Sequence, residues 1–139
     1  MFKILGVDHI GIASTSLEDG EFWKALGLEC TGEETVAEQK VTTAFYPTTA
    51  DKQHGEIELL VASEAGSPIE KFIEKNGGRG GIQHIALRVD NLEAALADLQ
   101  EKGIKLIDTK PRKGAGGAMI AFIHPKATHG VLLELCQRD

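Results

Sequence analysis

Alternating apolar and polar positions recur in two stretches that lie about half the chain apart. The first stretch is Gly6–Ala13 and the second is Ile82–Val89. Apolar residues at every second position are typical of a strand with one face against a core. On the opposite face each stretch carries a histidine, His9 or His84, followed by small residues. The repeat predicts two copies of one unit, each opening with a histidine-bearing strand.

The first half of the chain continues with a predicted helix and further strands. Ser16 is a suitable N-cap, Phe22, Ala25 and Leu26 form the expected apolar face, and Gly27 ends the helix. We expect a strand edge and a loop over Glu29–Glu38, strands at Lys40–Tyr46 and Glu56–Ala62, and a turn-rich connection over Pro47–Gly55.

A short helix and a glycine-rich linker separate the halves. Ser67, Pro68 and Glu70 form a strong helix start, and glycines mark the linker Asn76–Gly81. The second half then repeats the plan, with a helix from Asn91 to about Lys102. We expect its strands near Lys105–Asp108, Ala118–Ile123 and Gly130–Cys136, separated by the loops Thr109–Gly117 and His124–His129.

Each half therefore reads β-α-β-β-β, which predicts an α+β fold of two tandem modules. Such modules can form one curved sheet around a cleft, with the helices outside. A length of 139 residues suits a single domain over residues 1–139. We place module 1 at about residues 1–66, the connecting helix and linker at about 67–81, and module 2 at about 82–139.

Composition narrows the expected partners. The net charge of −6 and the pI near 5.4 argue against nucleic acid as the main partner. No apolar run approaches the roughly 20 residues of a membrane-spanning helix, and the sequence begins without a signal-peptide pattern. Cys30 and Cys136 are the two cysteines, which favours a reducing compartment without a disulfide framework. We expect a cytoplasmic protein that does not bind membranes.

Four residues stand out as candidate metal ligands. Glu58 follows His9 by 49 residues, and Glu134 follows His84 by 50, each glutamate within a closing strand among leucines. A carboxylate in such a strand is costly to bury without a compensating charge, which a divalent cation supplies. Two histidines and two carboxylates suit Co²⁺, Mn²⁺, Ni²⁺, Fe²⁺ or Zn²⁺ with positions open to substrate oxygens, and so a catalytic metal.

Simpler explanations exist for each residue taken alone. A single histidine on a strand is usually a surface or hydrogen-bonded residue, and Glu56 shares a strand face with Glu58, so that face could be a solvated edge. His54, His124 and His129 fall in predicted loops and have no equivalents in the other half. Trp23 is expected to pack, and no base is placed to activate Cys136.

Several segments resemble the vicinal oxygen chelate superfamily and, within it, the methylmalonyl-CoA epimerase family. The segments that carry the likeness are Asp8–Ala13, Ile57–Leu60, Ser67–Ile73, Gly81–Ala86, Val89–Asn91, Gly114–Ala118, Ala121–Lys126 and Gly130–Leu135. The late run from Gly-Ala-Gly-Gly through His-Pro-Lys to Gly-Val-Leu-Leu-Glu-Leu is the part most similar to the epimerases.

The resemblance implies a homodimer and a divalent cation held by His9, His84 and Glu134, with Glu58 as the remaining ligand. It also implies interconversion of (2R)- and (2S)-methylmalonyl-CoA, with Glu134 as both ligand and acid/base. Some members carry a second glutamate at the position of Thr43, which cannot act as an acid/base there.

An acyl-CoA substrate also calls for basic residues that bind phosphate. Lys110, Arg112 and Lys113, just before the glycine run, are the best candidates. Ordinary surface charge explains them equally well.

Three alternatives share the fold. A glyoxalase I-type lactoylglutathione lyase uses the same metal ligands and related proton transfer, so the ligands do not discriminate. An extradiol-type dioxygenase uses two histidines and one carboxylate, and Glu58 argues against it. A metal-free binding module of this fold has no need of all four ligands.

Overall fold

The computed structural model describes residues 1–51 and 54–138, and its contacts divide the chain into two units. Unit 1 combines Met1–Asp8 with the segment from His84 onward, and unit 2 is His9–Gln83. Residues 52 and 53 of the predicted connection Pro47–Gly55, and residue 139 at the end of predicted module 2, lie outside the described residues.

Unit 2 contains a sheet with the strand order β2-β3-β4-β1. The strand β1 enters this sheet through its last residues, His9–Ala13, which pair in parallel with β4. The strands β2, β3 and β4 pair antiparallel. The bounds are β1 (Ile4–Ala13), β2 (Gly32–Val36), β3 (Val41–Tyr46) and β4 (Glu56–Ala62).

Unit 1 repeats this arrangement with the order β5-β8-β7-β6. Here β5 and β8 pair in parallel, and β8, β7 and β6 pair antiparallel. The bounds are β5 (Gly81–Val89), β6 (Arg112–Lys113), β7 (Met119–Ile123) and β8 (Leu133–Gln137). The same pairing pattern in both units confirms the duplicated β-α-β-β-β plan and the α+β class.

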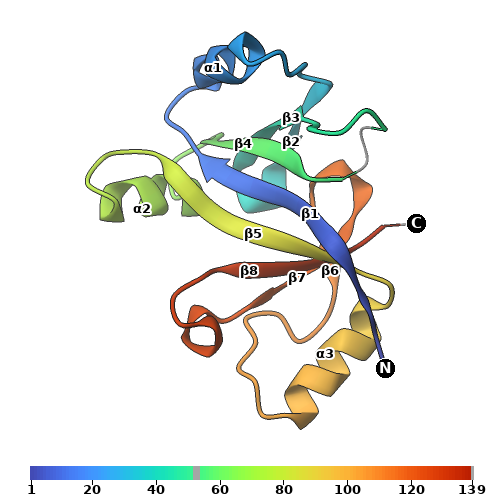
Figure 1. Cartoon of the computed structure of the whole chain (residues 1–139). Coiled ribbons are helices and arrows are strands. Elements are labelled where there is room, and N and C mark those ends of the chain that lie inside the picture. Colours follow the sequence, from blue (N-terminus) through green and yellow to red (C-terminus); the bar gives the residue numbers. More distant parts are fainter. Residues whose placement is uncertain (52–53, 139) are drawn as a thin grey trace. The chain divides into compact units, whose positions relative to one another are not determined.

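The helices cover the sheets of their own units. In unit 1, α3 (Leu92–Glu101) lies beside β7 and β8 (Figure 1), where Leu92 and Leu96 join the core. In unit 2, α2 (Pro68–Lys75) begins as predicted, because the Ser67 hydroxyl accepts the Ile69 N–H at 3.2 Å. Within the described residues, every helix is too short or too polar to cross a membrane.

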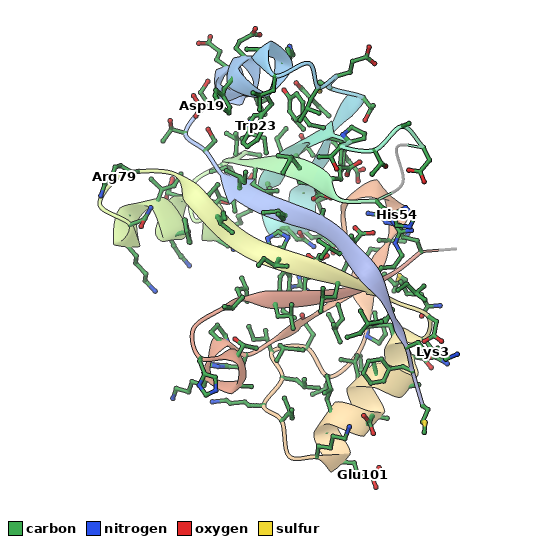
Figure 2. The ribbon with its side chains drawn as sticks, viewed as in Figure 1. Lys3, Asp19, Trp23, His54, Arg79 and Glu101 are labelled. Atoms are coloured by element: carbon green, nitrogen blue, oxygen red, sulfur yellow. The ribbon has the colours of Figure 1, made fainter. Side chains whose placement is uncertain are left out.

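The predicted apolar face of the first helix is wrong. A 3₁₀ turn (Leu17–Asp19) precedes the short α1 (Gly20–Ala25), and both Phe22 and Leu26 are exposed. Instead, Leu17 and Trp23 pack against the core of unit 2, and Figure 2 shows Trp23 on α1. A 3₁₀ turn has three residues per turn, so it rotates the following helix relative to a continuous α-helical periodicity.

The predicted strand Lys105–Asp108 is also wrong. Only an isolated bridge joins Leu106 to Ile123, and the Asp108 carboxylate accepts the Phe122 N–H at 2.8 Å. The Asp108 carboxylate thus takes the Phe122 N–H that a backbone carbonyl would accept in a regular β-ladder. The pairing therefore does not extend beyond the isolated bridge. The missing strand is β6, which lies within the predicted loop Thr109–Gly117.

The connections that were predicted to be loops contain short 3₁₀ turns. Their bounds are Ala37–Gln39, Ala115–Gly117 and Pro125–Thr128.

Candidate functional site

In unit 2, His9 and Glu58 form a buried pair on one face of the sheet. The register places Gly11 beside Glu58, so His9 lies diagonally across from the carboxylate. His9 Nδ1 is 3.3 Å from Glu58 Oε2, and about 5% or less of each side chain is exposed. Because Gly11 has no side chain, the imidazole can reach the carboxylate across the space beside it.

Unit 1 repeats this geometry with His84 and Glu134. Ala86 lies beside Glu134 in the register, as Gly11 lies beside Glu58. His84 Nε2 is 3.3 Å from Glu134 Oε1, and both side chains are buried. The duplicated sequence therefore builds the same imidazole–carboxylate pair twice, once in each unit.

The donor set of each pair suits a divalent cation. Burying a carboxylate without a compensating charge is costly, and a neutral imidazole compensates it only in part. Imidazole nitrogen and carboxylate oxygen are ligands for Mn²⁺, Fe²⁺, Co²⁺, Ni²⁺ and Zn²⁺. Glu58 is 3% exposed, which excludes the solvated-edge explanation for this residue. Each pair thus offers ligand types that suit a divalent cation.

Phe122 forms the wall beside the pair in unit 1. It lies directly across from Glu134 in the β7–β8 register, and its ring meets the His84 ring edge to face at 5.7 Å. The Arg112 guanidinium lies over the same ring, 5.5 Å from its centroid.

The three predicted substrate-binding cations separate onto two faces. Arg112 pairs with Ile120 and Lys113 with Met119, so the two side chains start from opposite faces of the sheet. Lys110 lines a surface cavity of about 530 Å³ together with Met119 and α3 residues. Only Arg112 shares the face of Glu134.

A second charged cluster in unit 1 was missed by the sequence analysis. Asp8 is buried and accepts hydrogen bonds from Arg88 and from Arg138, whose fork engages both carboxylate oxygens at 2.8 and 2.9 Å. Arg138 also donates to the Gly116 carbonyl. An aspartate next to a strand histidine gave no signal of partners 80 and 130 residues away.

The remaining candidates have structural explanations. His124 caps the 3₁₀ turn Pro125–Thr128, with Nδ1 accepting the Lys126 N–H, and His129 has the left-handed backbone that ends this turn. His54 is exposed and lies 3.5 Å from Asp51. Burial raises the pKa of the Cys136 thiol well above its usual range, with further contributions from Asp8 and Glu134, so it stays protonated.

Thr43 is buried on the face that carries Glu58. It lies across from Leu60 on one side and from Glu34 on the other. Its hydroxyl does not ionise near neutral pH, so this position supplies no acid/base of its own.

Comparison with known proteins identifies related sequences and structures. Residues 8–122 match the sequence profile of the Glyoxalase/Bleomycin resistance protein/Dioxygenase superfamily. Uncharacterized protein YqjC of Bacillus subtilis (strain 168) is 43% identical over 133 residues, covering 94% of this chain and 91% of the relative.

Two further relatives have named activities. Ethylmalonyl-CoA/methylmalonyl-CoA epimerase of Cereibacter sphaeroides is 36% identical over 134 residues, covering 94% of this chain and 96% of the relative. A variant of Streptomyces coelicolor methylmalonyl-CoA epimerase, solved in complex with 2-nitronate-propionyl-CoA, is 36% identical with a TM-score of 0.88. This match covers 97% of this chain and 98% of the solved chain.

Proposed function

The chain belongs to the glyoxalase/bleomycin resistance protein/dioxygenase superfamily, and on that premise we propose that it is a methylmalonyl-CoA epimerase. The enzyme is an isomerase that interconverts (2R)- and (2S)-methylmalonyl-CoA. The observation that carries this proposal is the match to epimerases over nearly the whole chain. The paired imidazoles and carboxylates supply the chemistry that such a reaction needs.

The proposed metal ligands are His9, Glu58, His84 and Glu134. They come as two pairs, each with a 3.3 Å contact between an imidazole nitrogen and a carboxylate oxygen, through Nδ1 of His9 and through Nε2 of His84. A bound divalent cation (Co²⁺, Mn²⁺, Ni²⁺, Fe²⁺ or Zn²⁺) would stabilise negative charge that develops on the thioester oxygen. We also propose that residues 1–139 form a single domain, which their length suits.

Glu134 is the proposed acid/base at C2 of the substrate. A carboxylate that removes this proton must be positioned rigidly and shielded from water. Glu134 meets both needs, because it is buried within β8 and is flanked by Phe122 on one side and Ala86 on the other. Ala86 is small and leaves room for a substrate beside the carboxylate.

Lys110, Arg112 and Lys113 are the proposed binding residues for the acyl-CoA. They form a cationic segment at the edge of the unit 1 sheet in a chain of net negative charge. Phosphate groups bind such lysines as point charges, whereas arginine offers a planar fork.

We also propose a homodimer in the cytoplasm. Ile4, Leu5 and Val7 at the start of β1 are each more than 40% exposed, which is a large apolar area to leave in water. Two cysteines, neither of them in a disulfide, suit a reducing compartment.

Deuterium exchange at C2 of methylmalonyl-CoA in D₂O tests the function. Metal-loaded protein is expected to incorporate deuterium with loss of stereochemistry, and chelated protein to lose this activity. Glu134→Gln keeps the shape of the side chain but removes the base, so exchange should fall by about 10²- to 10⁴-fold. A His84→Ala variant should lose metal as well as activity.

Other outcomes separate the alternatives. Turnover of a glutathione hemithioacetal without any C2 exchange would favour the lyase. Full metal content and full activity in the His84→Ala variant would refute the proposed centre.

A further inference from the structure

Arg112 occupies a defined position relative to the His84/Glu134 pair. The register pairs Arg112 with Ile120 on β7 and Phe122 with Glu134 on β8. Because residues two apart on a strand share a face, Arg112, Phe122 and Glu134 lie on the same face of the sheet. Arg112 therefore lies one row and two strands from the proposed acid/base.

The Arg112 side chain is held from two directions. Its Nε lies 3.2 Å from Asp108 Oδ1, while Asp108 Oδ2 accepts the Phe122 N–H at 2.8 Å. Its guanidinium carbon stands 5.5 Å from the centroid of the Phe122 ring, a cation–π distance. The ring in turn contacts His84. These contacts direct the guanidinium over the aromatic wall of the site.

Gly114 lets β6 approach β7 closely enough for this arrangement. A Cβ atom at position 114 would lie 2.7 Å from the Ile120 side chain, so a larger residue would push the two strands apart. The Gly114 N–H donates to the Ala118 carbonyl at 2.9 Å and closes the turn.

We propose that Arg112 binds the free carboxylate of the substrate and so selects acyl thioesters that carry a second acid group. This inference deepens the proposed function and rests on it. Among the described residues, the contacts of Arg112 use Nε and the face of the guanidinium, so both terminal amino groups can donate to a carboxylate. A two-donor fork matches the two oxygens of a carboxylate.

The position of Arg112 favours the carboxylate over the phosphates of coenzyme A. In a malonyl thioester the free carboxylate lies one carbon beyond C2, whereas the long pantetheine arm separates the thioester from the phosphates. Arg112 is next to the wall of the Glu134 site, while Lys113 starts from the other face and Lys110 lines a separate cavity. The two lysines remain the better phosphate ligands.

Calorimetric titration with methylmalonyl-CoA and with propionyl-CoA tests the inference by a measurement of binding rather than of activity. The two ligands share coenzyme A and differ in the free carboxylate. In Arg112→Gln, we expect methylmalonyl-CoA to bind about 10- to 100-fold more weakly and propionyl-CoA to change by less than about twofold. Arg112→Lys keeps the charge without the fork, so its loss should be intermediate. The titrations are repeated after chelation to separate the arginine from a bound cation.

Arg79→Gln is the matched control, because it removes the same charge elsewhere. Figure 2 shows Arg79 in the loop between α2 and β5, where its side chain is exposed. Both ligands should bind this variant as they bind the unaltered protein.

Two results would overturn the inference. Equally weakened binding of both ligands in Arg112→Gln would show that the residue contacts the coenzyme A part they share. Unchanged binding of both would show that Arg112 does not contact either ligand. Failure of the epimerase proposal has a different signature, because the unaltered protein would then show no C2 exchange. A selective loss of methylmalonyl-CoA binding in Arg112→Gln would, even then, establish Arg112 as a carboxylate-binding residue.

Discussion

Asp8 and Asp108 both pair with arginine in unit 1, but their surroundings differ. The Asp8 side chain is 1% exposed and accepts from two guanidinium groups, which are themselves mostly buried. Asp108 is more exposed and has one arginine, Arg112, whose side chain is 44% exposed. Aspartate–arginine contacts thus form a buried cluster around Asp8 and a partly solvent-exposed pair at Asp108.

The difference indicates separate roles. A buried aspartate with two arginines satisfies its oxygens and ties together β1, β5 and the residue that follows β8. A partly exposed ion pair contributes less to stability than a buried one, since water solvates the arginine well. The Asp108–Arg112 contact can therefore orient a side chain for a ligand at little cost to the fold.

Asp8→Asn should give the largest effect on stability. The substitution keeps the shape of the side chain but leaves two arginines without a compensating charge, so we expect a loss of about 3–5 kcal/mol. Urea denaturation followed by circular dichroism measures the free energy of unfolding. A loss below about 1 kcal/mol would show that Asp8 is no more important to the fold than a surface residue.

Gly114→Ala should have an intermediate effect. The backbone φ of −115° suits any residue, so the cost comes from the 2.7 Å contact between the new methyl group and Ile120. Overpacking of this kind costs about 1–3 kcal/mol. Because β6 must shift, the substitution should also weaken the binding of methylmalonyl-CoA more than the binding of propionyl-CoA in the calorimetric titration. Unchanged selectivity would separate the position of β6 from that of Arg112.

Asp108→Asn should have the smallest effect on stability, but it should reduce the selectivity for methylmalonyl-CoA over propionyl-CoA. The amide oxygen can still accept the Phe122 N–H, and only the partly exposed ion pair is lost, so we expect a change of about 1 kcal/mol or less. Arg112 then loses the contact that orients it, and the preference for methylmalonyl-CoA should fall. A stability loss equal to that of Asp8→Asn would abolish the distinction between the two aspartates.

The two buried histidine–glutamate pairs lie at positions that the sequence singles out, because the duplication repeats a period-2 pattern. Alternation alone assigns a residue to a face, and an unusual carboxylate among leucines singles out Glu58 and Glu134. The strand pairings that make the two His/Glu contacts then follow from the β-α-β-β-β order. The helix start at Ser67 could also be predicted, since a hydroxyl N-cap and a following proline are local signals.

Features that depend on tertiary contacts could not be predicted. The two-residue strand β6 has no periodicity to detect, and its face, which decides the role of Arg112, comes from pairing with β7. The failure over Lys105–Asp108 has the same origin, because the Asp108 carboxylate replaces a backbone acceptor. The orientation of α1 followed from a 3₁₀ turn that the apolar spacing did not reveal.

The division of β1 between the units affects the order in which the chain can fold during synthesis. Residues 9–83 form unit 2 and emerge from the ribosome as one continuous segment, so their pairing needs no later part of the chain. Asp8 emerges before all of them, yet it meets Arg138 across 130 positions. Closing so long a loop has an entropic cost, and the contact can form only after Arg138 has been synthesised. The Asp8 cluster therefore joins segments that are synthesised far apart in time.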